Sequence, residues 1–105
     1  EPLRIVTSQV ERIESEIDAL NGELEPLKSF VLPGGTPAAA YLHQARTVAR
    51  RAERLMVALT QVGDYPVSEA ATKYVNRLSD FFFVASRYAN AKAEGDVLWV
   101  PGQNR

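Results

Sequence analysis

The stretch from residue 37 to residue 62 constrains the fold most strongly, because after Pro37 it contains neither glycine nor proline. Thr36 and Pro37 form a typical helix start, a capping side chain followed by a residue that needs no N–H partner. Apolar side chains recur at helical spacing on one arc, at Leu42, Ala45, Val48, Ala49, Ala52, Leu55, Met56 and Leu59. The pattern predicts a long amphipathic helix, and its alanines allow the close packing that is typical of a helical bundle.

The complementary arc of this helix is strongly cationic. It carries His43, Arg46, Arg50, Glu53 and Arg54, with Arg51 beside it. Two arginine pairs stand at i,i+4 spacing, and each destabilises an isolated helix by roughly 0.2–0.5 kcal/mol, so one glutamate cannot offset them all. Such a row can bind a polyphosphate or carboxylates through bidentate hydrogen bonds. A structural network with acidic residues of another helix or subunit explains the spacing equally well, and the pattern leaves both interpretations open.

Two further helices are predicted. Ser8 and Glu11 have the spacing of a capping box at the start of an apolar seam, formed by Val10, Ile13, Ile17, Leu20 and Leu24. After a turn at residues 63–66, Ser68 is the expected cap of a third helix that runs to about Asn90. The expected core face of that helix consists of Ala71, Val75, Leu78, Phe82 and Ala85, extended by Tyr74 and Phe81.

The opposite stripe of the third helix is polar apart from one aromatic residue. Its members are Glu69, Lys73, Asn76, Asp80, Phe83 and Arg87. A solvated face is the simplest interpretation of this stripe. Asn76 and Asp80 are one turn apart, so both can point at the same neighbour. Phe83 is the exception, because an aromatic in a polar stripe is expected to be buried against another element or chain.

Two non-helical segments flank the helices. Gly34 and Gly35 precede the long helix and are typical of a turn, because the stretch lacks both the Lys-Ser/Thr of a P-loop and a three-glycine dinucleotide motif. The C-terminal tail, residues 96–102, is predicted to be extended and apolar. Trp99 in this tail is expected to serve as a packing anchor.

Composition narrows the function classes. The 105 residues fit one domain over 1–105, and a net charge of -1 argues against general binding to nucleic acid or membrane surfaces. The chain has no cysteine, which excludes disulfides and thiolate chemistry, and its apolar runs are too short to span a bilayer. His43 is the only histidine and is expected at the surface, so no metal or nucleophile constellation is predicted.

Four segments, in order along the chain, resemble signatures of the PduO-type ATP:cob(I)alamin adenosyltransferases. They are residues 29–37 (SFVLPGGTP), 45–54 (ARTVARRAER), 74–80 (YVNRLSD) and 95–99 (GDVLW). The resemblance implies an all-α fold, with about three of the five helices of a bundle that assembles as a homotrimer and has active sites between subunits. It also implies a transferase that moves the 5′-deoxyadenosyl group of ATP to cob(I)alamin, giving adenosylcobalamin and triphosphate.

The resemblance assigns roles to individual residues. Arg50, Arg51, Glu53 and Arg54 are implied to bind ATP, with Asn76 reaching the site from the next helix. Arg50 is also implied to act in catalysis, since a fixed cation stabilises the charge that builds on a departing triphosphate.

Three further residues are implied to shape the site. Phe30 matches the apolar residue on the lower face of the corrin, where displacing the axial ligand eases reduction to Co(I), and it is therefore taken as catalytic and cobalamin-binding. Arg46 is implied to pair with an acidic residue across the subunit interface, and Asp80 to contribute to interface and site geometry. Mg²⁺ is expected to accompany ATP.

The chain also departs from the family pattern. It lacks the N-terminal Thr-Gly and Gly-rich segment that wraps the ATP phosphates and the early lysine-bearing helix, so we expect it to be a C-terminal part of a longer protein and inactive alone. A cytoplasmic location, a flavin-dependent reductase and a B12-dependent enzyme are the implied context. A non-catalytic helical module that oligomerises or holds cobalamin is the alternative, and a purely structural bundle is a third reading.

Overall fold

The structure, a computed structural model, describes residues 4–27, 29–63 and 67–101. In these ranges the chain forms three helices and two very short strands. Their order is α1 (Thr7–Asn21), β1 (Val31–Leu32), α2 (Pro37–Val62), α3 (Glu69–Ala91) and β2 (Val97–Leu98). The predicted all-α class is therefore confirmed.

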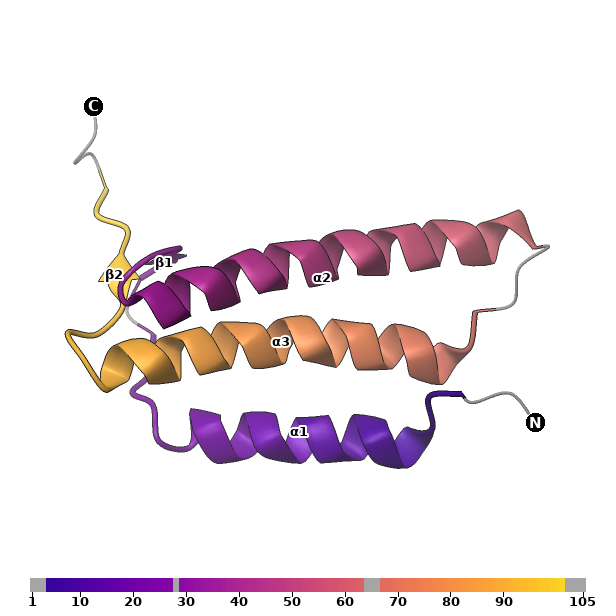
Figure 1. Cartoon of the computed structure of the whole chain (residues 1–105), viewed down its shortest axis with the longest axis horizontal. Helices are drawn as coiled ribbons and strands as arrows, with labels where there is room; N and C mark the ends of the chain where they lie inside the picture. Colours follow the sequence, from indigo (N-terminus) through magenta and orange to yellow (C-terminus); the bar gives the residue numbers. More distant parts are fainter. Residues whose placement is uncertain (1–3, 28, 64–66, 102–105) are drawn as a thin grey trace.

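Helix α3 lies in the middle of the molecule and packs against both α1 and α2 (Figure 1). The described parts of α1 and α2 do not contact each other. The three helices therefore form one layer, with overall dimensions of 50 × 33 × 22 Å. Both sides of α3 are covered, whereas α1 and α2 are each covered by a neighbour on one side.

The helix ends follow the predicted caps with one exception. Thr36 Oγ1 accepts a hydrogen bond from the Ala39 N–H at 3.1 Å, and Ser68 Oγ accepts one from the Ala71 N–H at 3.0 Å. The predicted Ser8 cap of α1 is wrong, because the N-cap is Val6, two residues earlier, and Gln9 Oε1 accepts a hydrogen bond from the Val6 backbone N–H at 2.9 Å. Of the predicted turn at 63–66, residues 64–66 lie outside the described ranges.

The seam of α1 is confirmed at Val10 and Ile13, which are both buried. The predicted core face of α3 is only half-buried, and the deepest positions include Ser79 and Ser86. Their hydroxyls donate to backbone carbonyls three residues earlier, at 2.8 and 2.6 Å, so burial leaves neither group unpaired. The two serines lie seven residues apart and so on one face of α3, where their small side chains allow close approach of a neighbour.

The orientation expected for α2 is wrong in part. Val48 and Leu55 of the predicted apolar arc are 61% and 62% exposed, whereas His43 of the polar arc is 6% exposed. The helical period of the sequence defines an apolar and a polar arc of α2, but it does not determine which arc packs against a neighbouring helix. In the described part of the chain α2 packs on α3 alone, so the side with Ala39, His43 and Ala49 is buried and the opposite side is open.

Strands β1 and β2 pair in antiparallel fashion, with Val31 opposite Leu98 and Leu32 opposite Val97. The extended tail is thereby confirmed, and it closes on the loop that precedes α2 (Figure 1). Across the described ranges, no helix has the length and apolarity that a bilayer span requires. The β1–β2 pair, called the ribbon below, lies beside the start of α2 and the end of α3 (Figure 1).

Candidate functional site

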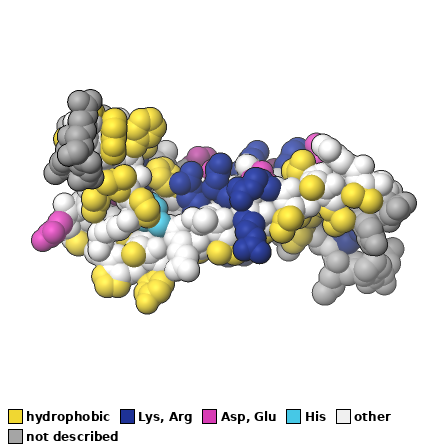
Figure 2. Space-filling view, turned by 90° about the horizontal axis from the view of Figure 1, so that it is seen from above, with side chains coloured by type: hydrophobic (Ala, Val, Ile, Leu, Met, Phe, Trp, Pro, Cys, Tyr) yellow, Lys and Arg dark blue, Asp and Glu magenta, His cyan; other side chains and the backbone are white. Residues whose placement is uncertain are grey.

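The arginines of α2 divide into an exposed group and one inward-facing member. Arg50, Arg51 and Arg54 are exposed, and within the described residues none of them forms an ion pair. Lys and Arg side chains gather in the middle of the face that α2 presents (Figure 2). These three guanidinium groups lie within about 6 Å of helix length, at 1.5 Å per residue, and a row of this kind can bind a polyanion.

Glu53 lies among these arginines and is held from α3. Asn76 Nδ2 donates a hydrogen bond to Glu53 Oε2 at 2.9 Å, so the predicted approach of Asn76 to the arginine helix is borne out in geometry. Both side chains are half-buried. Because only one carboxylate oxygen takes this bond, the other stays available to a guanidinium or to a ligand hydroxyl.

Arg46 points toward α3 rather than outward with the other arginines. Its guanidinium lies 4.8 Å from the centre of the Phe83 ring, a cation–π geometry, and Phe83 is thus packed on another element as predicted. Arg46 Nε is buried, and no hydrogen-bond acceptor for it occurs among the described residues. A buried charged donor without an acceptor is costly, and the contact with the Phe83 ring offsets part of that cost.

His43 is buried beside the same aromatic ring, and the surface position expected for it is wrong. The His43 and Phe83 rings meet edge to face with centres 6.3 Å apart. Burial lowers the pKa of His43, the Arg46 charge lowers it further, and Asp96 opposes both. The imidazole is therefore neutral near pH 7, and its Nε2 is buried without a hydrogen-bond partner among the described residues.

Asp80 lies elsewhere. It is exposed and borders a groove between α1 and α3 together with Glu14, Asp18 and Arg77. Asn76 and Asp80, which could have shared a neighbour, do not, because Asn76 bonds to Glu53 of α2 and Asp80 borders the groove beside α1; the interface role of Asp80 stays a prediction. The one-turn spacing was compatible with either arrangement, since α3 has a helix on each side.

Phe30 stands at the other end of α2, beside the ribbon. It is 76% exposed, and its ring meets the edge of Trp99 with centres 6.0 Å apart. The Trp99 N–H donates to the Phe30 carbonyl at 2.8 Å, and Ser29 Oγ donates to the Trp99 carbonyl at 2.8 Å. The backbone N–H and carbonyl of Trp99 thus hold the loop, whereas the residue is 44% exposed, so the packing anchor predicted for it is only partly borne out.

An exposed apolar patch surrounds this contact, and yellow side chains mark it at the ribbon end of Figure 2. Its members are Phe30, Leu32, Tyr41, Val97, Leu98, Trp99 and Val100. Exposed apolar side chains gathered in this way are typical of a ligand or protein contact surface. It lies about 20 Å along α2 from Arg50, at 1.5 Å per residue.

Two buried residues of α3 hold the loop before α2 and the C-terminal tail in place, and neither was predicted to be important. Asn90 is 1% exposed and bonds to the backbone of Gly34 and Thr36. Arg87, expected on a solvated stripe, is 8% exposed because it bonds to Asp96 Oδ2 and the Glu25 carbonyl, both at 2.8 Å. The one sequence feature that could have indicated their burial is their spacing from Phe83, because Arg87 and Asn90 follow it by four and seven residues and so lie on the same face of α3.

The described residues also bear on metal binding. Among them, no three His, Asp or Glu side chains come close enough together to hold a metal ion. A surface pocket of about 300 Å³ between α1 and α3 is lined by both acidic and basic residues, including Glu11, Glu14, Lys73 and Arg77. The exposed arginines of α2 do not line this pocket.

Comparisons with known proteins agree on one family. A family model described as cobalamin adenosyltransferase matches residues 1–89. The corrinoid adenosyltransferase of Mycobacterium tuberculosis (strain H37Rv) is 54% identical over 104 residues, which are 99% of this chain and 53% of the relative. The chain thus spans about half the length of the curated relatives it matches.

Solved structures give the same result. One variant of a PduO-type ATP:corrinoid adenosyltransferase from Lactobacillus reuteri, complexed with cobalamin and ATP, is 37% identical with a TM-score of 0.81, covering 95% of this chain and 53% of that one. A second variant, complexed with ATP, is 36% identical with a TM-score of 0.83, covering 94% and 55%. In the first variant a phenylalanine is replaced by histidine, and in the second an arginine is replaced by lysine. The extent of these matches shows that the chain belongs to the cobalamin adenosyltransferase family.

Proposed function

We propose that the full-length protein transfers the 5′-deoxyadenosyl group of ATP to cob(I)alamin, giving adenosylcobalamin and triphosphate. The Co(I) electron pair attacks the ribose C5′, the C5′–O bond breaks, and its electron pair leaves with the triphosphate. Cobalt becomes formally Co(III), so the cobalamin substrate supplies the nucleophile. The protein has to orient the two substrates and stabilise the leaving group.

The exposed arginine row of α2 carries this proposal. Arg50, Arg51 and Arg54 present guanidinium groups without an internal counter-ion in the described structure, and a triphosphate is a matching polyanion. Charge grows on the triphosphate in the transition state, so a preorganised cation lowers the barrier, with about 1.4 kcal/mol giving tenfold in rate. Glu53, fixed by Asn76, is suited to accept from a ribose hydroxyl.

Phe30 and its apolar patch provide the proposed corrin contact. An exposed aromatic side chain on the lower face of a corrin would exclude water from the lower axial position, which favours four-coordinate cobalt and its reduction. In the Lactobacillus reuteri variants, the separation along the chain between the substituted phenylalanine and arginine equals that between Phe30 and Arg50. That spacing supports placing these two residues beside the cobalamin and ATP named for those structures.

We also propose that a second subunit completes the site in a homotrimer. The open side of α2 supports this, since in the described residues α2 packs on α3 alone and a second subunit can cover the rest. Mg²⁺ would be held mainly by triphosphate oxygens and water, because Glu53 is the one carboxylate within the arginine row. The reductase, the B12-dependent enzyme and the cytoplasmic location stay predictions.

The test is adenosyl transfer by the full-length protein with chemically reduced cob(I)alamin and MgATP. Adenosylcobalamin is followed by its light-sensitive absorption spectrum and triphosphate by ion-exchange chromatography. We expect both products in equal amounts. Arg50→Ala should lower the rate by about 10²–10³-fold, the usual effect of removing one transition-state donor.

Arg12→Ala is the matched control, because Arg12 is an exposed arginine of α1 whose partner is Glu16 on the same helix. It should retain wild-type activity. Cobalamin binding without any triphosphate release would support the non-catalytic holding module instead. A protein that bound neither ATP nor cobalamin by calorimetry would overturn both readings.

A further inference from the structure

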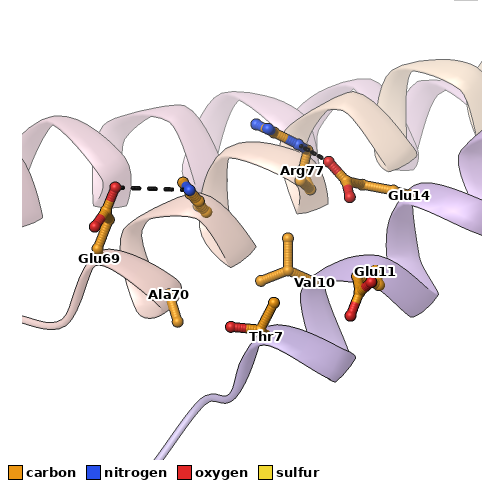
Figure 3. Close-up of a pocket in the computed structure, with 8 residues that line it drawn as sticks. Thr7, Val10, Glu11, Glu14, Glu69, Ala70 and Arg77 are labelled. Carbon is orange, nitrogen blue, oxygen red and sulfur yellow. Dashed lines mark hydrogen bonds and ion pairs between the residues drawn. The ribbon is translucent and has the colours of Figure 1, made fainter.

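Four polar side chains form a continuous chain of hydrogen bonds across all three helices. Arg77 Nε donates to Glu14 Oε2 at 2.8 Å, and Arg77 Nη1 donates to Asn76 Oδ1 at 2.6 Å. Asn76 Nδ2 then donates to Glu53 Oε2 at 2.9 Å. Figure 3 shows the first link, with Arg77 of α3 pointing toward Glu14 of α1. The chain starts at a carboxylate on one side of the molecule and ends at a carboxylate within the arginine row on the other.

This chain fixes the orientation of the Asn76 amide. A guanidinium has donors only, so the amide atom that faces Arg77 must be the oxygen. The amide nitrogen then points at Glu53, where a carboxylate has acceptors only. Without Arg77 the amide can rotate, and its oxygen would face Glu53 unfavourably in part of the population. Arg77 therefore selects the one amide orientation that holds Glu53.

Glu14 performs the same task for Arg77. The guanidinium is planar, and its Nε and Nη1 donors point in fixed directions, so a bond at one constrains the other. Arg77 and Glu14 side chains are 32% and 43% exposed, and exposed ion pairs of this kind contribute little to stability. The geometry of the pair matters more than its energy.

We propose that Arg77, held by Glu14, is a positioning residue for the ATP site, acting through Asn76 on Glu53. The inference rests on the proposed function and adds residues to it that lie outside the arginine row. It predicts that a change on the α1 side of the molecule alters ATP binding on the α2 side. Cobalamin binding at the ribbon end should be unaffected.

The test uses the full-length protein and measures KM for ATP and for cobalamin separately. Arg77→Met keeps most of the side-chain volume and removes every donor. We expect KM for ATP to rise about 5–30-fold, less than the roughly 10–150-fold for losing a charged hydrogen bond outright because Arg77 acts through Asn76, with KM for cobalamin unchanged. Arg12→Met, on the exposed face of α1, is the matched control and should leave both values unchanged.

A double-mutant cycle separates positioning from general structural damage. In an Asn76→Ala background the link between Arg77 and Glu53 is already broken, so adding Arg77→Met should change KM for ATP by less than about twofold. If Arg77 had a purely structural role, Arg77→Met would have its full effect in the Asn76→Ala background as well and would raise KM for both ATP and cobalamin. A full effect in that background, or a rise in both KM values, would overturn the inference.

Arg77→Lys covers the case in which Arg77→Met does not fold. Lysine keeps the charge and a donor, but a single ammonium cannot present two donors in fixed directions, so KM for ATP should still rise. If the variants that fold bind ATP as wild type does, the inference fails while the proposed function stands. If wild-type protein binds no ATP, the proposed function itself fails.

Discussion

The side-chain amide of Asn90 occupies the space that a side chain at Gly35 would need. Gly35 has φ of 97°, and a Cβ added there would collide with the amide oxygen and nitrogen of Asn90. From this position Asn90 Oδ1 accepts from the Thr36 N–H at 2.9 Å, and Asn90 Nδ2 donates to the Gly34 carbonyl at 3.0 Å. The contact fixes the loop that carries Phe30 onto the end of α3.

Gly35→Ala should therefore destabilise the protein in two ways. A left-handed backbone costs a residue with a Cβ about 1–2 kcal/mol, and displacing Asn90 adds about 1–3 kcal/mol for broken buried hydrogen bonds. We expect a loss of about 2–5 kcal/mol in the free energy of unfolding, measured with urea. Gly63→Ala is the control, since Gly63 has φ of 85° and open space around it. Equal losses in the two variants would contradict the collision.

Asn90→Asp tests whether this loop controls the corrin contact. The carboxylate still accepts from the Thr36 N–H, but it places a second acceptor against the Gly34 carbonyl, which loses its donor. We expect a loss of about 1–3 kcal/mol in stability and a rise in KM for cobalamin, with KM for ATP unchanged. Gln61→Glu adds the same charge at an exposed position of α2 and should change neither KM. Equal effects on both KM values would argue against local control.

Asp96→Asn tests the ion pair that holds the tail. Arg87 Nε donates to Asp96 Oδ2 at 2.8 Å, and the two side chains are only 10% and 14% exposed. Removing one partner of a buried pair leaves an unpaired charge, so we expect a loss of about 2–4 kcal/mol in urea unfolding. Glu16→Gln breaks the exposed pair with Arg12 and should cost less than about 1 kcal/mol. Similar losses in the two variants would show that burial does not make the Arg87–Asp96 pair more important for stability than the exposed pair.

The helices could be predicted because their signals are local. The bounds of α2 follow from Thr36 at one end, Gly63 at the other and an unbroken helical period between them. Which side of α2 is buried is not a local property, and that prediction failed for His43. The polar arc meets α3 because Glu53 and Arg46 find partners there in Asn76 and Phe83.

The site shows the same division. The arginine row is contiguous in sequence, and Asn76 falls within a recognisable motif, so both could be predicted. Asn90 contacts Thr36 across 54 positions of sequence, and Arg77 contacts Glu14 across 63. Such pairs depend on how α3 packs between its neighbours, which a single sequence with no repeated pattern does not reveal.

His43 gives the fold a pH dependence with a definite sign. Its pKa lies below the ordinary 6.5, chiefly because it is buried, with the Arg46 charge adding to the effect and Asp96 opposing it. Because the unfolded chain has the higher pKa, it takes up the proton first as the pH falls below about 6.5, and stability is lost over that window. Wild-type protein should therefore lose more free energy of unfolding between roughly pH 7.5 and 5.5 than His43→Gln does. The chain has one histidine, so the difference between the two urea unfolding series isolates it. Parallel pH profiles would mean that His43 titrates alike in both states, whereas a steeper loss in the variant would reverse the sign argued here.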